Sequence, residues 1–304
     1  MSKVGRVIEI PAELAASQAE WNGEAGRAFI AALPGRAEEF LNRWGLRPTG
    51  PSMHGAASLV LPVSRADGTR AALKLQLLDE ETEGEPVALR TWAGDGAVRL
   101  LEHDRETGTL LLERADETRH LSGSGDARGA VRVLADLLAR LVAVPAPPGL
   151  RSLGDIAARM VAAAPKAAGR LADPDDTALL KDCAAAVREV MGEPGDRLLH
   201  WDLHYDNVLA SEREPWLAID PKPLTGDPGF ELLPALTNLW NPDPAETSWR
   251  FDLLTERLDL DRARARAWTL ARVLQNGLWD VADGEPALDP DQVSIARNLL
   301  ARRP

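Results

Sequence analysis

Apolar and polar positions alternate with a strand period over the first third of the chain. Residues 57–63 and 69–77 are mainly apolar runs, and the turn sequence Ala66-Asp67-Gly68 separates them, which is typical of a β-hairpin. A second pair of runs, 97–102 and 109–113, flanks another turn. We therefore predict two antiparallel hairpins in this part of the chain.

Helical spacing of apolar positions surrounds and follows these hairpins. Ala37, Phe40, Leu41 and Trp44 share one face of a predicted helix over 35–44. Glu85, Ala88, Leu89 and Trp92 have the same three- and four-residue spacing between the two hairpins. The later chain predicts helices around 131–141, 151–166 and 175–191, short strands at 197–200, 207–210 and 216–220, and more helix up to the C-terminus.

This order of elements predicts an α+β fold with two lobes. Residues 1–115 would form a small lobe with an antiparallel sheet preceded by helices, and residues 116–304 a larger, mostly helical lobe. A chain of 304 residues is long enough to bury a large core without disulfides.

Charge and cysteine content narrow the class of protein. The formal net charge of −12 argues against binding to a nucleic-acid backbone, which needs clustered Lys and Arg. Cys183 is the only cysteine, so it forms no internal disulfide, and its Ala-rich surroundings predict a buried, inert thiol. The segment Met1–Leu14 carries no apolar core of a secretory signal, and no run of 18 apolar residues occurs. We expect a cytoplasmic protein that has no membrane span.

The densest polar segment is His200-Trp201-Asp202-Leu203-His204-Tyr205-Asp206-Asn207, which lies between two short apolar runs. A second acid, Asp220, follows the next apolar strand. The pattern H-x-D-x-x-x-x-N followed by a strand ending in Asp is typical of kinase-type phosphoryl transfer. Taken alone, the octapeptide could also be a polar turn, since Asp and Asn are common turn residues.

Each of these residue types suits one task in phosphoryl transfer. Asp202 can orient an acceptor hydroxyl and take its proton, while His200 is expected to support the loop by hydrogen bonding. Asn207 and Asp220 offer the hard oxygen ligands that Mg²⁺ prefers.

A nucleotide-binding lysine is also predicted. Lys74 lies inside the second strand of the first hairpin, one helix before Glu85, and this combination favours a lysine that binds ATP phosphates over a solvated strand face. Because Pro86 fits only the first turn of a helix, Glu81 and Glu83 stay open as alternative partners of Lys74.

The remaining candidates for nucleotide binding carry a weaker signal. The phosphate-covering loop would contain Gly55 and Ser58, although no G-x-G-x-x-G pattern occurs. Backbone groups near Glu113, at the end of the last strand of the small lobe, could hydrogen-bond adenine.

Together these segments resemble the aminoglycoside phosphotransferase family, most closely its streptomycin 6-kinase/hydroxyurea kinase branch. The resemblance extends over nearly the whole chain and is most specific at 200–207, at 218–222 and in Gly226-Asp227-Pro228. It implies a protein-kinase-like fold, ATP and Mg²⁺ as cofactors, and phosphorylation of a hydroxyl on an aminoglycoside-type antibiotic, which confers resistance. Asp202 would be the catalytic base, Asn207 and Asp220 the Mg²⁺ ligands, and Lys74 and Glu85 the ion pair of the nucleotide lobe.

The acceptor is less defined by the sequence. A polycationic antibiotic requires carboxylates and aromatic faces. The candidates for this side of the site are His204, Asp227, Glu231, Trp279 and Asp280. The same branch contains kinases of small uncharged hydroxyl compounds, so hydroxyurea, a sugar or an amino alcohol stays open as the acceptor.

Two other classes of function remain as alternatives. His200-x-Asp202-x-His204 resembles a zinc-binding pattern of a metal-dependent hydrolase, although no histidine follows His204. A non-catalytic nucleotide-binding module on the same fold is the second alternative, although it would usually lack the base or a metal ligand.

Overall fold

The computed structural model describes residues 8–240 and 243–302. The first half of Met1–Leu14, where no secretory signal is predicted, therefore lies outside the described residues. The chain divides into two compact units, Met1–Gly94 with Val98–Ala115, and Asp95–Ala97 with Asp116–Pro304. Among the described helices, none combines the length and the apolar character needed to cross a membrane.

The first unit is built on an antiparallel sheet of six strands with the order β1-β3-β4-β6-β5, in which β2 also pairs with β3. The predicted hairpins are β3 with β4 and β5 with β6. The strands are β1 (Arg47–Pro48), β2 (Met53–His54), β3 (Ser58–Ser64), β4 (Arg70–Gln76), β5 (Leu100–His103) and β6 (Leu110–Glu113).

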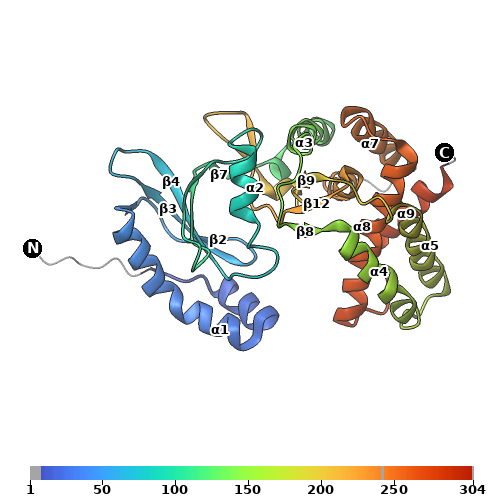
Figure 1. Ribbon diagram of the computed structural model, residues 1–304, viewed down its shortest axis with the longest axis horizontal. Coiled ribbons are helices and arrows are strands. Elements are labelled where there is room, and N and C mark those ends of the chain that lie inside the picture. The colour runs from blue at the N-terminus through green and yellow to red at the C-terminus, as the bar shows by residue number, and fades with distance from the viewer. Residues whose placement is uncertain (1–7, 241–242, 303–304) are drawn as a thin grey trace, which may run out of the picture. The chain divides into compact units, whose positions relative to one another are not determined.

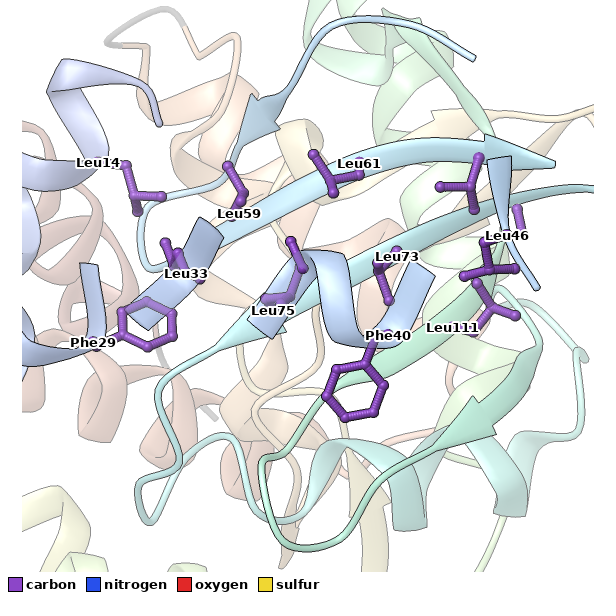
Figure 2. Packing of buried hydrophobic residues seen from close by; sticks show 13 residues of the cluster. Leu14, Phe29, Leu33, Phe40, Leu46, Leu59, Leu61, Leu73, Leu75 and Leu111 are labelled. Atoms are coloured by element: carbon purple, nitrogen blue, oxygen red, sulfur yellow. The ribbon is translucent and has the colours of Figure 1, made fainter. Parts of the chain in front are cut away.

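Helix α1 (Ala12–Arg43) covers one face of this sheet (Figure 1). The helix is kinked at Gly23, whose φ of 53° and ψ of −121° are not helical. Figure 2 shows the core between the helix and the sheet. Its larger members are Leu14, Phe29, Leu33 and Phe40 from α1 and Leu59, Leu61, Leu73, Leu75 and Leu111 from the strands. Each fully buried side chain of this kind contributes roughly 1.5–3 kcal/mol.

Alternation along β4 sends successive side chains to opposite faces of the sheet. Leu73 and Leu75 enter the core below α1, and Lys74 and Gln76 therefore point to the other face. Helix α2 (Glu85–Trp92) follows, with Pro86 in its first turn, where its missing N–H costs nothing. The helix thus begins at Glu85.

The second unit is mostly helical. Its helices are α3 (Ala127–Leu141), α4 (Leu153–Ala168), α5 (Pro174–Val190), α6 (Leu233–Thr237), α7 (Pro244–Arg257), α8 (Arg262–Asp283) and α9 (Pro290–Ala301). Figure 1 shows α5, α8 and α9 side by side. Buried residues occupy nearly the whole circumference of α8 from Ala267 to Gln275, so this helix passes through the centre of the unit.

Two small sheets hold the polar segment identified in the sequence. One has the order β11-β10-β7 and the other the order β8-β12-β9. Their strands are β7 (Asp116–His120), β8 (Arg151–Ser152), β9 (Arg197–Leu199), β10 (Val208–Ala210), β11 (Trp216–Ala218) and β12 (Leu224–Gly226). Residues 200–207 therefore connect a strand of one sheet to a strand of the other.

Candidate active site

The loop 200–207 is held in a backbone conformation that L-residues rarely adopt. Trp201 has a φ of 66°, and Asp220, which follows β11, has a φ of 56°. A positive φ costs a bulky residue free energy, so the surrounding contacts must impose it. Two strained non-glycine residues within the predicted catalytic segments indicate that their side chains are held in specified directions.

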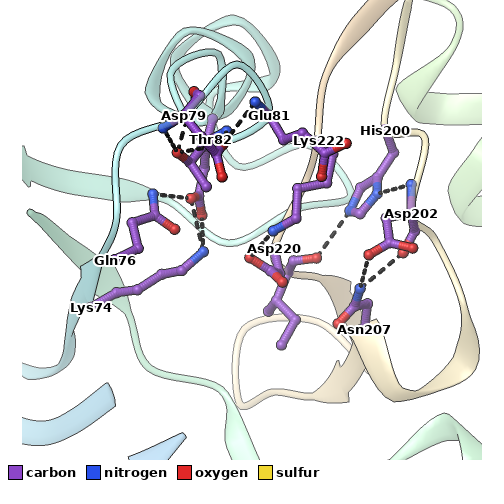
Figure 3. Close-up of polar contacts among 12 residues, drawn as sticks. Lys74, Gln76, Asp79, Glu81, Thr82, His200, Asp202, Asn207, Asp220 and Lys222 are labelled. Carbon is purple, nitrogen blue, oxygen red and sulfur yellow. Dashed lines mark hydrogen bonds and ion pairs between the residues drawn. The ribbon is translucent and has the colours of Figure 1, made fainter. Parts of the chain in front are cut away.

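His200 supports this loop from a fully buried position. Its Nε2 lies 3.0 Å from the carbonyl oxygen of Ile219, and the backbone N–H of Asp202 donates to its Nδ1 at 3.3 Å (Figure 3). Burial lowers the pKa of His200 to about 3, so the imidazole is neutral, donates through Nε2 and accepts through Nδ1. His200 therefore links the loop 200–207 to Ile219, the residue before Asp220. These hydrogen bonds agree with the supporting role expected for it.

Asp202 presents a half-buried carboxylate beside His204. Its Oδ2 lies 4.0 Å from Nε2 of His204. Burial raises the pKa of Asp202, and the nearby charges of His204 and Arg272 oppose that rise. The carboxylate is thus placed to accept a proton from a hydroxyl group.

Asn207 and Asp220 come from the two strands of one hairpin. Val208 pairs with Ala218, and the N–H of Ile219 donates to the carbonyl oxygen of Asn207 at 2.9 Å. This pairing fixes the two polar residues as neighbours at the end of the hairpin.

The donor atoms of this pair fit a hard cation. The amide nitrogen of Asn207 donates to the carbonyl oxygen of Asp202 at 2.9 Å, which leaves Oδ1 as its ligand atom. The carboxylate of Asp220 accepts from Nζ of Lys222 at 2.9 Å. One amide oxygen and one carboxylate are a suitable protein contribution to Mg²⁺, which keeps its other positions for water and phosphate.

In the first unit, the ion pair expected between Lys74 and Glu85 is present. Nζ of Lys74 lies 2.8 Å from both carboxylate oxygens, and Gln76 donates to Oε2 at 2.7 Å (Figure 3). Lys74 is only 4% exposed and Glu85 is 0% exposed, so the alternative of a solvated strand face is wrong. The role of this pair in nucleotide binding stays a prediction.

The other residues predicted to bind nucleotide also lie in the first unit. Gly55 and Ser58 close the turn between β2 and β3, where the N–H of Gly55 donates to the carbonyl oxygen of Ser58 at 3.0 Å. The N–H of Glu113 donates to the carbonyl oxygen of Arg99 at 2.8 Å, and its carboxylate accepts from the N–H of Arg99. This donor of Glu113 is therefore already used within the protein.

Glu231 is buried, unlike an acid that is exposed to solvent or faces a substrate. It is fully buried, and its Oε1 accepts from the N–H of Trp201 at 2.7 Å. Burial raises the pKa of Glu231 to about 7, opposed by this N–H and by the Arg272 guanidinium. The prediction of a substrate role is corrected here, because Glu231 holds the strained loop in place.

Asp227 also serves the fold. Its Oδ1 accepts from the N–H of Gly229 at 2.8 Å and caps the short helix Pro228–Glu231, while Oδ2 pairs with Arg264. These contacts engage both carboxylate oxygens, so they argue against its predicted contact with substrate.

A cavity of about 210 Å³ opens beside His204. Its lining is mostly polar and comes from the loop, from the α6 region, from α8 and from the start of α9. The residues are His204, Leu233, Pro234, Thr237, Asn238, Arg272, Asn276, Asp289, Asp291 and Gln292. The cavity thus adjoins the neighbour of Asp202 and contains two acids that the sequence did not single out.

Trp279 and Asp280, predicted on the acceptor side, lie in the last turns of α8 and do not line this cavity. Trp279 is 46% exposed, and the guanidinium carbon of Arg272 lies 5.7 Å from the centre of its ring.

The sequence pattern of the aminoglycoside/hydroxyurea antibiotic resistance kinase family matches residues 43–284. The chain belongs to this family. A hydroxyurea phosphotransferase of Kitasatospora aureofaciens is 64% identical over 304 residues, which cover 99% of this chain and 89% of that protein. A streptomycin 6-kinase of Streptomyces glaucescens is 59% identical over 300 residues, which cover 97% of this chain and 98% of that protein.

The fold of this antibiotic resistance kinase is also found in solved structures. A thermostable mutant of an aminoglycoside phosphotransferase, in a ternary complex with AMP-PNP and hygromycin B, matches it with a TM-score of 0.61. The match covers 86% of this chain and 97% of that chain at 14% identity. The prediction of a kinase-like fold with an antiparallel N-terminal sheet and a helical C-terminal region is confirmed.

Family membership decides between the classes of function left open by the sequence. The chain is a kinase of the antibiotic resistance type, so the non-catalytic and hydrolase alternatives are set aside. The geometry of His200 agrees, because both of its ring nitrogens have contacts within the protein.

Several residues of the site were missed by sequence reasoning, namely Gln76, Lys222, Arg272, Asp289 and Asp291. The sequence did contain a signal for Arg272, namely its helical spacing. It lies four residues from Trp268 and from Asn276 and therefore shares a side of α8 with the buried Trp268. An arginine on such a face marks a buried charge.

Proposed function

We propose that this kinase transfers the γ-phosphoryl group of ATP to a hydroxyl of an aminoglycoside-type antibiotic, as a streptomycin 6-kinase does. The observation that supports this proposal is the close grouping of Asp202, Asn207 and Asp220. The pairing of β10 with β11 keeps Asn207 and Asp220 at one end of the hairpin, and a hydrogen bond joins Asn207 to Asp202. Because the donor is ATP, we assign the protein to the cytoplasm.

The residues divide the reaction between them. Asp202 accepts the proton of the acceptor hydroxyl as its oxygen forms a bond to the γ-phosphorus, and the bond from that phosphorus to the bridging oxygen of ADP breaks. Asn207 and Asp220 would hold Mg²⁺, which when bound neutralises charge on the phosphates. Lys74, oriented by Glu85, which in turn accepts from Gln76, would bind the α- and β-phosphates.

The cavity beside His204 is the candidate acceptor site. Asp289 and Asp291 line it and offer carboxylates that suit a cationic antibiotic, although one oxygen of Asp289 also caps α9 by accepting from the N–H of Gln292 at 2.9 Å. His204 connects this cavity to Asp202, since 4.0 Å separates its Nε2 from Oδ2 of Asp202. A hydroxyl bound in this cavity would be near the base.

Hydroxyurea is the second candidate acceptor. The relative that is 64% identical over 304 residues is a hydroxyurea phosphotransferase, and the cavity of about 210 Å³ is large enough for so small a molecule. Both acceptors share the same reaction, so the assignment of Asp202, Asn207 and Asp220 is unaffected by the choice.

The test is mass spectrometry of reactions that contain Mg·ATP and either streptomycin, another aminoglycoside or hydroxyurea. We expect a product heavier by one phosphoryl group, and Asp202→Asn should reduce the rate on the order of 10²–10⁴-fold. Asp206→Asn, in the same loop, is the matched control and should retain activity. Near-full activity of Asp202→Asn would refute the role of the base, and failure to phosphorylate any acceptor would refute the proposed substrates.

A further inference from the structure

Arg272 is a buried arginine in the wall of the candidate acceptor cavity. It comes from α8 and is 7% exposed. It lines the same cavity as His204, whose Nε2 lies 4.0 Å from Oδ2 of Asp202, so Arg272 and the neighbour of the predicted base share one cavity. A buried cation costs desolvation free energy, so the contacts that hold Arg272 at the wall of the cavity bear on its role.

Contacts with aromatic rings and a hydrogen bond to Gln275 help to fix the orientation of this guanidinium. Its central carbon lies 5.4 Å from the ring centre of Trp201 and 5.5 Å from that of Phe230. Its Nη1 donates to Oε1 of Gln275 at 3.0 Å. Stacking uses the faces of the guanidinium, whereas its N–H groups donate within the plane, so a stacked arginine keeps the geometry of a directional donor.

The cavity is therefore lined by charged side chains of both signs. Asp289 and Asp291 suit cationic groups, whereas Arg272 repels a cation and suits an oxygen that accepts hydrogen bonds. Arg272 lines the cavity together with His204, the neighbour of Asp202, so the part of the acceptor that reacts should be neutral and rich in oxygen.

We propose that Arg272 determines acceptor specificity by donating a hydrogen bond to an oxygen adjacent to the hydroxyl that is phosphorylated. This inference rests on the proposed function. The substrate class is a hydroxyl compound with a neighbouring carbonyl or hydroxyl oxygen. Hydroxyurea meets this requirement through its carbonyl group and an aminocyclitol through a vicinal ring hydroxyl, so one donor explains how a single site accepts either compound.

The first test compares Arg272→Gln and Arg272→Lys with the wild type and with Arg266→Gln, a control from the same helix whose Nη1 bonds the backbone of Arg302 instead. Arg272→Gln should raise KM for streptomycin or hydroxyurea on the order of 10- to 100-fold, the usual effect of losing a charged hydrogen bond. Arg272→Lys should recover part of this loss, because it restores the charge but not the planar fork. KM for ATP should stay within about twofold of the wild type, as expected for a residue on the acceptor side.

The second test compares two acceptors and starts from the wild type. The wild type is given hydroxyurea and N-hydroxyguanidine, which replaces the carbonyl oxygen by a nitrogen and is readily protonated. We expect kcat/KM to favour hydroxyurea on the order of 10-fold or more, and Arg272→Gln to lose this preference. If hydroxyurea is not a substrate, the proposal is decided by the first test, in which KM for streptomycin is compared between the Arg272 variants and the wild type.

The proposal is overturned if the wild type accepts both compounds equally, or if Arg272→Gln changes the ATP and acceptor constants alike, as a structural role would. Failure of the wild type to phosphorylate any acceptor would instead refute the proposed function itself.

Discussion

Glu231 gives a prediction that can be worked out quantitatively. Its side chain is fully buried in the second unit, Oε1 accepts from the N–H of Trp201, and Oε2 has no hydrogen-bond partner among the described residues. The pKa of Glu231 rises from 4.5 to about 7 because burial disfavours the charged form. The folded protein therefore holds this proton more tightly than the unfolded chain does.

The sign of the pH dependence follows from this difference. Between pH 4.5 and pH 7 the folded state binds more protons at Glu231, so its contribution to stability is fully present below pH 4.5 and is lost as the pH rises through about 7. At 1.36 kcal/mol per tenfold change in proton affinity the total is roughly 3 kcal/mol, most of which falls between pH 5 and pH 8.

Glu231→Gln removes this titration and keeps an oxygen that can accept from Trp201. Relative to the wild type, the free energy of unfolding of the variant should increase by roughly 2–3 kcal/mol between pH 5 and pH 8. Urea denaturation at several pH values measures it, because Trp201 and Trp268 are buried in the same unit and report its unfolding by fluorescence.

Glu246 provides a control of opposite sign. Its pKa is lowered, although partial burial opposes this, because the Arg250 and Arg128 side chains donate hydrogen bonds to it. Its contribution is therefore present above the unfolded pKa and is lost as the pH falls, so Glu246→Gln should approach the wild type in stability at acidic pH. A constant difference between Glu231→Gln and the wild type from pH 5 to pH 8 would refute the account of Glu231.

Three further outcomes are expected. Asp220→Asn should lower kcat/KM for ATP by about 10²-fold or more and raise the Mg²⁺ concentration needed, and an unchanged Mg²⁺ titration would contradict its role as a ligand. Glu85→Ala leaves Lys74 buried without the carboxylate that accepts from it in the wild type, so the first unit should lose about 3–5 kcal/mol in urea denaturation and KM for ATP should rise. Burial raises the pKa of Cys183 to about 12, so iodoacetamide at pH 8 should label only the denatured protein, and rapid labelling of the native protein would show that the thiol is accessible.

Hydrophobic periodicity was sufficient to predict the regular elements of both units. The hairpin β3–β4 lies within about one residue of its predicted bounds, and helix α3 ends at the predicted residue but begins four residues earlier, because each buries one regular face. Strand β7, with the sequence Asp-Glu-Thr-Arg-His, was not predicted, since it has no apolar positions and forms only through its pairing with β10.

The candidate site was predictable where chemistry depends on spacing along the chain. The sequence singled out the segment 200–207 and Asp220, and the β10–β11 hairpin brings Asn207 and Asp220 together because paired strands fix such spacings. Their catalytic and metal-binding roles stay predictions. Glu231 and Arg272 were misread or missed, since their roles come from burial against Trp201, and a linear sequence does not show which charged side chains are buried. Glu231 and Arg272 lie far from the loop 200–207 along the chain, so the sequence does not reveal that they contact Trp201.

The β10–β11 hairpin also bears on how much change in length the chain tolerates. The two predicted metal ligands sit at one end of the hairpin, and their separation depends on the pairing of Val208 with Ala218. The connecting residues 211–215 lie at the opposite end, where Arg213 and Glu214 contact Ala97 and Arg140. Insertions or deletions in this connection would remove the contacts of Arg213 and Glu214. They would leave unchanged the register between β10 and β11, and with it the spacing of the two predicted metal ligands. We therefore expect insertions and deletions to be tolerated only at the end of the hairpin that carries none of the predicted metal ligands.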